Sequence, residues 1–490
     1  MTKLSTSSLP DLRSPVRVPT YDRSAVRGGI LHFGVGNFHR AHQAAYIDDL
    51  LEHGSDMRWG IVGAGVLPGE RPGWQKLRDQ DWLTTVVEQD VEHIDARVTG
   101  AMVDFLAPGD AAAIVERLCD PSIAIVSLTI TEGGYFRDAS GAFAADHPAV
   151  LGDAARPESP ATVFGIMLAG LRRRRSAGIA PFTVVSCDNI PHNGHVTASA
   201  LKGLAGVRDP DLAAWIEDNV ACPDGMVDRI TPRTSDEQVL LLRERFGIED
   251  NWPVFCEPFR QWVLEDHFPL GRPALEEVGV EFVADVAPYE SMKIRILNGG
   301  HAALAYPAAL LGHRFVHDAM GDPLIRSFLD KLEREEIIPT VGLIPGTDMS
   351  AYFRSVARRF GNPAIADTIQ RLCFDGSNRQ PKFILPVARD RLRATGRARG
   401  LALVSALWCR YCQGSMETGG RVEANDPQWD RLRETADAAR ARPGAWLDMS
   451  DIYGDLGQSE AFAADFREEL RHIWDHGTAS ALSRFASAGD

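Results

Sequence analysis

The sequence feature that most constrains the fold is a short apolar run that stops at a pair of glycines. Residues 29–33 (GILHF) are followed by Gly34-Val35-Gly36, and a helical pattern then covers residues 41–51. A strand, a glycine turn and a helix open a dinucleotide-binding domain, because a backbone without side chains can approach a pyrophosphate at a helix N-terminus. The third position of that fingerprint is His39 rather than glycine, so a plain strand-to-helix turn remains an alternative.

Strand-like and helix-like segments alternate through the first part of the chain. Further apolar strand candidates are residues 59–65, 123–130 and 182–187, and residues 163–177 are helical in pattern. This alternation predicts a doubly wound, mostly parallel sheet, so we expect an α/β domain of the Rossmann type over residues 1–285. From about residue 288 helical patterns dominate, at residues 291–311, 322–336, 392–412 and 458–474. Residues 286–490 should therefore form a mainly α-helical domain for the substrate and the catalytic groups.

Composition narrows the classes of partner. The chain has 52 Lys and Arg against 67 Asp and Glu, a formal net charge of −15, which disfavours nucleic acid and anionic membranes. No apolar run approaches the roughly 18 residues of a membrane span, and residues 1–19 lack a signal-peptide core. The seven scattered cysteines are typical of reduced thiols, and the Cys409/Cys412 pair lies in an apolar helical run. We therefore expect a cytoplasmic protein, as a monomer or weak oligomer.

An acidic residue at the end of the second strand normally favours NAD over NADP, because it binds the ribose diol and repels a 2′-phosphate. The usual spacing of about 20 residues leads to Asp56, which precedes the second strand, whereas Glu70 lies in the loop after it. Arg71 beside Glu70 could stack on adenine or accept a 2′-phosphate. We expect NAD, with some use of NADP.

Two polar segments directly follow apolar strands, at residues 129–135 (TITEGGY) and 186–194 (SCDNIPHNG). They should lie at the carboxyl ends of the strands, where open α/β sheets bind ligands, although each alone could be a simple turn.

A third polar cluster lies on a helical pattern in the second half of the chain. At about 100° per residue, four side chains fall within one arc of roughly 140°: Glu290, Lys293, Asn298 and His301. A lone helical lysine is usually a solvated surface charge, but burial in this apolar helix would lower the pKa of Lys293 toward the range of a general base.

These segments together resemble the polyol-specific long-chain dehydrogenases, most closely the branch that acts on mannitol. The resemblance is carried by residues 34–50 (GVGNFHRAHQAAYIDDL), 129–135, 186–194 and 226–232 (MVDRITP), and by the segment around Lys293. It covers nearly the whole chain, in the same order and with near-equal spacing. It implies a metal-independent oxidoreductase with a Rossmann-type and a mainly helical domain, interconverting mannitol, or a similar polyol, and fructose with NAD(H). Other members act on arabinitol, sorbitol, fructuronate or tagaturonate.

The resemblance also implies roles for individual residues. Lys293 corresponds to the general base, and Asn189 and Asn298 correspond to amides that hold the reacting oxygen. The other implied site residues are His301 for substrate orientation, Glu290 beside the lysine, Glu132 near a proton channel, and Asp228 and Arg371 at the polyol hydroxyls. Close relatives have lysine where this chain has Arg379, so that contact with the polyol is less secure.

We expect the cofactor to be held around the glycine turn, in the loop after the second strand and in the two polar segments. The expected residues are Phe33, Gly34, Gly36, Asn37, Phe38, His39, Arg40, Glu70, Arg71, Thr131 and Asp188. The sequence has no HExxH motif, cysteine cluster or paired histidine ligands, so we expect no metal. Two rival functions are a sugar-acid reductase, which would need a further cation for the carboxylate, and a non-catalytic dinucleotide-binding sensor.

Overall fold

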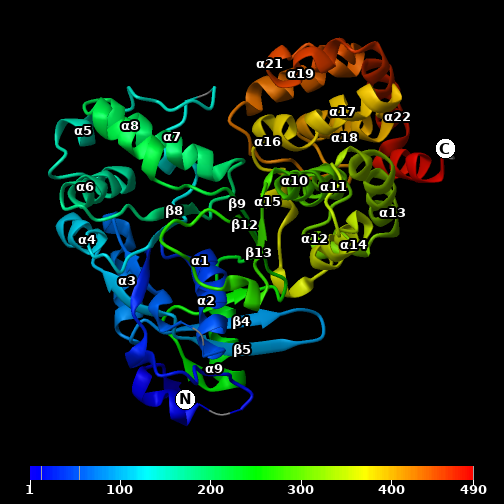
Figure 1. The fold of residues 1–490 in the computed structure, drawn as a ribbon. Coiled ribbons are helices and arrows are strands. Elements are labelled where there is room, and N and C mark those ends of the chain that lie inside the picture. Colours follow the sequence, from blue (N-terminus) through cyan, green and yellow to red (C-terminus); the bar gives the residue numbers. More distant parts are fainter. Residues whose placement is uncertain (13, 55, 139, 489–490) are drawn as a thin grey trace. The chain divides into compact units, whose positions relative to one another are not determined.

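The computed structural model describes residues 1–12, 14–54, 56–138 and 140–488, which form two compact units (Figure 1). The first unit is Met1–Ala287 and the second is Pro288–Asp490. The first contains a parallel sheet of the Rossmann type and the second is built from helices, so the expected fold class is confirmed.

Five parallel strands form the central sheet of the first unit. They are β2 (Gly28–Phe33), β3 (Gly60–Ala64), β6 (Met102–Leu106), β7 (Ile125–Leu128) and β8 (Thr183–Ser186). Their spatial order is β6-β3-β2-β7-β8, so the chain winds outward from β2 first to one side and then to the other. The direction reverses between β2 and β7, and open α/β sheets bind ligands at the carboxyl ends of the strands at such a switch point.

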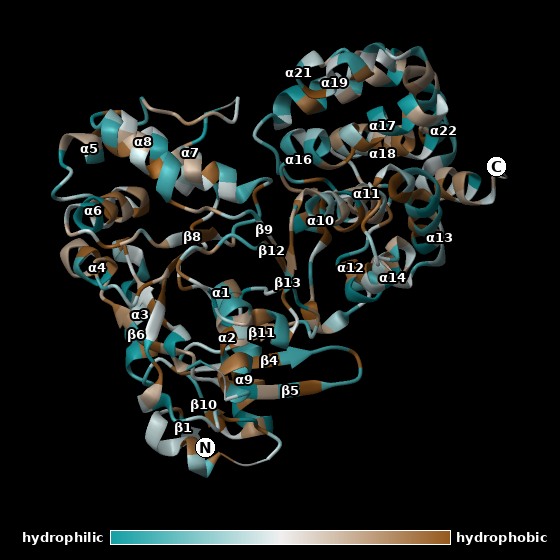
Figure 2. Cartoon of the chain, viewed as in Figure 1, coloured by the Kyte–Doolittle hydropathy of each residue, from teal (hydrophilic) through white to brown (hydrophobic). Residues whose placement is uncertain are grey.

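Helices connect these strands, as the alternating pattern predicts. They include α3 (Arg71–Arg78), α4 (Ala111–Leu118) and α6 (Val163–Ser176), and α7 (Asn193–Gly206) follows the last strand, β8. The helix expected over residues 41–51 is two helices, α1 (Asn37–Ala41) and α2 (Gln43–Glu52). The backbone of His42 leaves the helical region there, with φ −117° and ψ −85°. Buried strand residues such as Leu31, Val62 and Val126 place the core directly around the sheet, and the apolar strands can be followed in Figure 2.

Smaller sheets that the sequence analysis did not predict complete the first unit. A hairpin of β4 (Thr84–Gln89) and β5 (Ile94–Thr99) pairs with β11 (Val254–Cys256). A second sheet contains β9 (Gly225–Asp228), β12 (Gln261–Glu265) and β13 (Glu281–Val283).

The start of the chain is also paired. Strand β1 (Thr2–Lys3) runs parallel to β10 (Ile248–Glu249), and the Thr2 amide donates to the carbonyl of Gly247 at 2.7 Å. Leu4, which follows β1, is fully buried.

The second unit is helical, but two of its helical runs contain π-helical turns. Helix α10 (Ala287–Met292) continues into a π segment, Lys293–Asn298, and then into α11 (Gly299–Leu310). Likewise α13 (Pro323–Leu332) continues into a second π segment, Glu333–Ile337. A π turn closes i→i+5 hydrogen bonds and is frequent at functional sites.

Helix boundaries elsewhere in this unit differ from the sequence prediction. The single helix expected over residues 392–412 is wrong, because α17 (Leu385–Thr395) ends at Gly396 before α18 (Arg399–Cys412) begins. Gly396 has φ +76°, the left-handed cap that commonly ends a helix. Helix α22 (Glu460–Ser487) extends well beyond the expected residue 474 and bends at Gly477.

The core of the second unit surrounds α11 and α18. Both are buried along most of their length, and Trp408 packs edge-on against Trp446 with ring centres 4.9 Å apart. Cys409 and Cys412 lie inside this apolar core.

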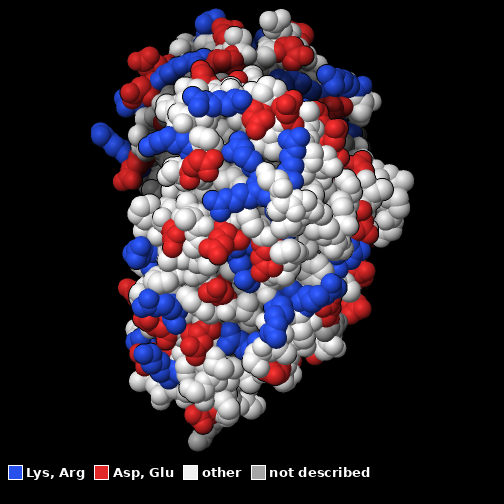
Figure 3. All heavy atoms as spheres, turned by 60° about the vertical axis from the view of Figure 1, so that its left-hand side comes forward, with Lys and Arg blue, Asp and Glu red and all other residues white. Residues whose placement is uncertain are grey.

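No helix within the described ranges is both long enough and apolar enough to cross a membrane. Acidic and basic side chains are interspersed on the face shown in Figure 3.

Candidate active site

The turn after β2 has the backbone geometry that its glycines predict. Gly34 has φ +90°, and a Cβ atom there would lie 2.1 Å from the carbonyl oxygen of Thr129, so no other residue fits. The Thr129 hydroxyl donates to the Gly34 carbonyl at 2.6 Å and ties the ends of β2 and β7 together. At Gly36 the nearest atom to such a Cβ lies 3.7 Å away. Space in front of Gly36 fits the close approach of a pyrophosphate to the backbone.

Phe33, His39 and Arg40, which we expected to bind the cofactor, are fully buried. The His39 ring stacks on His32 of β2 at 3.5 Å and fills the space that a third glycine would leave between helix and strand. Burial holds the pKa of His39 well below its usual range, so the ring is neutral. These buried side chains support the turn from inside, and their expected contacts with the cofactor stay a prediction.

Arg40 fixes the turn and the start of α1. Its guanidinium donates to the Gly36 carbonyl at 3.2 Å and to Asn37 Oδ1 at 2.9 Å, and it also bonds the carbonyl of Trp252. Asn37 in turn donates through Nδ2 to the carbonyl of Pro232 at 3.1 Å. Phe38 is partly exposed and stacks on His42 at 4.8 Å.

Glu70 lies in the loop after β3, as expected. Its Oε2 accepts the backbone N–H groups of Val66 and Leu67, each at 2.7 Å, and this closes the loop. Arg71 is exposed and donates to the carbonyl of Pro108 at 3.2 Å. Asp56, the alternative acidic residue, caps a short turn before β3 and pairs with Arg58.

The loops after β7 and β8 are joined by one buried carboxylate. Asp188 accepts the N–H groups of Ile130 and Thr131, each at 2.9 Å, and the hydroxyl of Tyr135 at 2.7 Å. Thr131 is held at φ +65°, a backbone strain that such sites store. Asp188 therefore organises the loop, and its expected contact with the cofactor stays a prediction.

The structure leaves Asn189 and Glu132 exposed on these two loops. Asp228, at the end of β9, is buried. The start of β9 is fastened to the loop after β8 by Asn193, whose amide both donates to the Gly225 carbonyl at 2.7 Å and accepts its N–H at 2.9 Å. Sequence analysis did not give Asn193 this role, although it lies in the second polar segment.

In the second unit, Lys293 and Glu290 are only 7% and 8% exposed. The solvated surface lysine, which was the alternative interpretation, is therefore excluded. Asn298 is partly exposed at the end of the π segment. Residues 293–298 form a π turn, which rotates by less than 100° per residue. The angular positions predicted for Asn298 and His301 from an ordinary α-helix are therefore wrong.

His301 is 7% exposed and stacks on Phe360 with ring centres 3.9 Å apart. Burial, followed by the positive charges of Arg371 and Arg379, holds the pKa of His301 well below its usual range. The ring is therefore neutral, with one nitrogen to donate and one to accept. Arg371 is held by both carboxylate oxygens of Asp367, at 2.6 and 2.5 Å.

A buried carboxyl group that the sequence analysis did not identify lies beside this segment. Glu333 opens the second π segment and is fully buried, and a Cβ atom at Gly300 would lie 2.9 Å from its Oε1. Neither carboxyl oxygen has a hydrogen-bond partner among the described residues. Burial raises the pKa of Glu333 well above its usual range, so the group is protonated. Gly300 provides the space for this neutral acid immediately before His301.

A histidine cluster in the first unit was also missed. His192, His195 and Asp224 bring three potential metal-ligating atoms within 4.8 Å of one another. The expectation that no histidine ligands are paired is therefore wrong. The two histidines are three residues apart around the start of α7, but the carboxylate comes from the segment before β9, which the sequence pattern did not connect to them.

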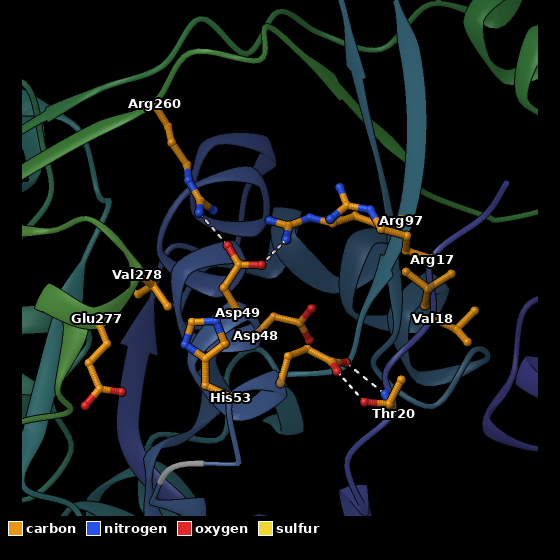
Figure 4. A pocket seen from close by; sticks show the side chains of 12 residues that line it. Arg17, Val18, Thr20, Asp48, Asp49, His53, Arg97, Arg260, Glu277 and Val278 are labelled. Atoms are coloured by element: carbon orange, nitrogen blue, oxygen red, sulfur yellow. Dashed lines mark hydrogen bonds and ion pairs between the residues drawn. The ribbon is translucent and has the colours of Figure 1, made fainter.

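A pocket of about 720 Å³ lies elsewhere in the first unit (Figure 4). It is lined by the end of α2, with Asp48, Asp49 and His53, and by Arg17, Arg97 and Arg260. Because a crossover helix runs back along the sheet, the end of α2 lies toward the amino ends of the strands, opposite the glycine turn. Figure 4 shows Asp49 between Arg97 and Arg260, and its carboxylate forms ion pairs with both arginines.

Comparison with known protein families agrees with this arrangement. Residues 28–277 match the mannitol dehydrogenase Rossmann domain, and residues 285–474 match the mannitol dehydrogenase C-terminal domain. The chain belongs to the mannitol dehydrogenase family and is a polyol dehydrogenase.

Individual relatives are similar over almost their full length. The chain is 55% identical to a mannitol 2-dehydrogenase of Cereibacter sphaeroides, across 96% of this chain and 98% of that protein. A Pseudomonas fluorescens mannitol 2-dehydrogenase, solved as a ternary complex with NAD and D-mannitol, is 42% identical with a TM-score of 0.86, across 99% of this chain and 100% of that one. A substrate-free D-sorbitol dehydrogenase is 37% identical with a TM-score of 0.92, across 98% and 100%.

Proposed function

We propose that this protein is an NAD(H)-dependent 2-dehydrogenase that interconverts mannitol and fructose, with Lys293 as general base in oxidation and general acid in reduction. The observation that carries the proposal is the burial of the Lys293 amine in a helical run that also contains a buried carboxyl group, Glu290, and a neutral imidazole, His301. A general base at neutral pH needs such an environment, because burial favours the uncharged amine.

In the proposed reaction, Lys293 takes the proton of the C2 hydroxyl group as the carbonyl forms. NAD⁺, when bound, supplies the acceptor for the hydride that leaves C2. Asn189 and Asn298 donate hydrogen bonds to the oxygen on which negative charge develops, and neutral His301 orients a neighbouring hydroxyl. We assign Glu290 to tuning the pKa of Lys293 and Glu132 to a channel through which protons leave the site.

The cofactor site is proposed at the switch point between β2 and β7. Three features support a dinucleotide site there. Only glycine fits at position 34, the backbone at Gly36 has space in front of it, and Glu70 closes the loop after β3. The Glu70 carboxylate disfavours a 2′-phosphate, so we propose NAD with some use of NADP.

Substrate contacts are proposed for Asp228, Arg371 and Arg379. The Asp367 carboxylate holds the Arg371 guanidinium in one orientation, as a group that positions a polyol hydroxyl requires. Arg379 extends over Phe383, with its guanidinium carbon 5.6 Å from the ring centre. Its charge near His301 also makes a sugar acid such as fructuronate the rival substrate to test.

Sorbitol is the second candidate polyol, because the similar D-sorbitol dehydrogenase structure carries that name. Mannitol and sorbitol differ only in configuration at C2, and both give fructose when oxidised there. The rate of fructose reduction therefore does not tell which of the two polyols is the substrate. The rates of oxidation of mannitol and of sorbitol do.

The decisive experiment measures initial rates of oxidation of mannitol, sorbitol and arabinitol, and of reduction of fructose and fructuronate, each with NAD(H) and NADP(H). Mannitol with NAD⁺ should give the highest kcat/KM among the oxidations. A higher value for fructuronate reduction than for fructose would replace the proposed substrate with a sugar acid. NADH binding without turnover on any of these compounds would support the non-catalytic sensor.

We further propose that the enzyme works without a metal, in the cytoplasm, as a monomer or weak oligomer. The amine and amides assigned to the reaction require no metal ion, and the strongly negative charge disfavours association with nucleic acid or anionic membranes. Size-exclusion chromatography with light scattering would measure the oligomeric state.

A further inference from the structure

The geometry points to a binding site for one divalent transition-metal ion of the Zn²⁺ class, formed by His192, His195 and Asp224. None of these three residues has a role in the proposed reaction. The inference goes beyond the proposed function and does not depend on it.

The ligand set defines the class of ion. Two imidazole nitrogens and one carboxylate oxygen are the donors that Zn²⁺, Ni²⁺ and Cu²⁺ prefer, whereas Mg²⁺ and Ca²⁺ take oxygen ligands. Asp224 Oδ2 lies 2.7 Å from His195 Nδ1 and 3.8 Å from His192 Nδ1. With metal bonds of about 2.1 Å, tetrahedral donors lie about 3.4 Å apart, which falls between these two distances.

The carboxylate is already fixed in place. Asp224 is buried, and its Oδ1 accepts the N–H groups of Gly194 at 2.6 Å and His195 at 3.1 Å. These bonds cap the start of α7 and leave Oδ2 directed at the two imidazoles. Such support from neighbouring groups is what orients a ligand in a metal site.

The backbone that carries the ligands is also held. Asn193, between the two histidines, is fastened by the two reciprocal bonds to Gly225, one residue after Asp224. A Cβ atom at Gly194 would lie 2.4 Å from the Cys222 carbonyl oxygen, so the two segments are in direct contact. The site is therefore built on one clamped unit.

An ion can reach this site, because the side chains of His192 and His195 are 60% and 77% exposed. Three protein ligands leave a fourth position of a tetrahedral ion open to water or to another small ligand.

The test uses full-length protein stripped with EDTA and dialysed, titrated with ZnCl₂ by calorimetry and with Co²⁺ by visible absorption. The test variant is His192→Gln/His195→Gln, which keeps Asp224 and the cap of α7. The matched control is His476→Gln, because His472 and His476 on α22 are another histidine pair, with ring centres 4.7 Å apart. Thermal unfolding without metal confirms that all three proteins fold.

We expect one tight equivalent of Zn²⁺ in the wild type and in the control, weakened at least about a hundredfold in the double variant. The Co²⁺ absorption typical of tetrahedral sites should disappear with it. A tight equivalent that survives in the double variant, or that is lost in the control, would overturn the proposal, as would the absence of any tight equivalent in the wild type. None of these readouts depends on turnover, so the result is separate from that of the proposed function.

Discussion

Two groups of candidate residues, one in each unit of this protein, are presented in opposite ways. In the first, Asn189, Glu132 and Thr131 are exposed on loops that follow strands, and hydrogen bonds to the buried Asp188 hold one of those loops. In the second, Lys293 and Glu290 are buried within a continuous helical run. An amide donor or a dinucleotide contact needs position but not burial, whereas a lysine base needs burial to lose its charge. We infer that changes at these loop residues alter positioning, whereas changes at Lys293 and Glu290 alter protonation.

The largest effect should come from removing the buried amine. Lys293→Ala is expected to lower mannitol oxidation about 10²- to 10⁴-fold, the usual loss for a general base, while NADH still binds because the glycine turn is unchanged. Rates across a pH series, with NADH affinity measured by fluorescence, check this expectation. A small primary amine in the buffer should restore part of the activity. Wild-type rates with an unchanged pH profile would mean that the base is misassigned and that the contrast between the units fails.

The corresponding change in the first unit removes the carboxylate that organises the loop. Asp188→Ala leaves two backbone N–H groups and the Tyr135 hydroxyl without their acceptor, so the free energy of unfolding should fall by about 2 to 4 kcal/mol. NADH affinity should fall with it. Tyr135→Phe removes one of these three bonds, together with the 2.6 Å bond between the Tyr135 and Ser186 hydroxyls, and is the control, with an expected loss of about 1 to 2 kcal/mol. Urea denaturation measures both, and equal losses would show that Asp188 does not hold the loop.

Asp48 is a buried carboxyl group in the first unit, and burial raises its pKa to about 6. Above its ordinary pKa of about 4, the folded state then holds a proton that the unfolded state has lost, so stability falls as the pH rises through 6. Asp48→Asn should remove this slope and gain up to about 3 kcal/mol relative to wild type between pH 4 and 7. The asparagine oxygen can still accept from Tyr21 and Gly100, as Asp48 Oδ1 does. The free energy of unfolding of both proteins is measured with urea across this pH range. If the two proteins differ by the same amount at every pH, the raised pKa of Asp48 is contradicted.

A smaller effect is expected at the cofactor loop. Glu70→Gln keeps an acceptor for the N–H groups of Val66 and Leu67 but removes the charge that repels a 2′-phosphate. The ratio of NADP to NAD efficiency should rise roughly fivefold, as for an electrostatic term of about 1 kcal/mol. Asp56→Asn is the control. If that variant changes the ratio and Glu70→Gln does not, the selecting carboxylate is Asp56.

The last prediction is that removing metal ions does not change the rate of mannitol oxidation. Complete removal of metal with EDTA should leave mannitol oxidation unchanged, because an amine and two amides carry the proposed chemistry. Loss of activity that added Zn²⁺ restores would overturn the lysine mechanism. The same stripped sample serves the Zn²⁺ titration, so binding at His192 and His195 can be measured apart from turnover.

The sequence predicted four strands of the parallel sheet, β2, β3, β7 and β8, because they are short, mostly apolar and separated by helical patterns. It missed β6, which has Asp104 at its centre. It placed β2, β3 and the Gly34 turn within one or two residues. It also brought the polar segments after β7 and β8 to one edge of the sheet, where the bonds of Asp188 join them.

The remaining features depend on distant partners or on local geometry that residue periodicity does not reveal. Over six residues, the π turn at Lys293–Asn298 has the same apolar spacing as an ordinary helix. The sequence therefore did not show that the side chains after Lys293 are rotated relative to an α-helix. Asp224 meets His195 across 29 residues of chain, and Glu333 reaches Gly300 from another helix. Gly396, in contrast, was a readable signal, because glycine commonly ends a helix in this conformation.

The pairing of β1 with β10 has a consequence for synthesis on the ribosome. Strand β1 begins at Thr2, and its partner strand is complete only at residue 249, about 247 residues later. At about 5 to 20 residues per second, the first strand therefore waits roughly 12 to 50 seconds for its partner. All five strands of the central sheet are complete by Ser186, so that sheet can assemble while the amino-terminal strand and the apolar Leu4 remain unpaired and open to chaperones.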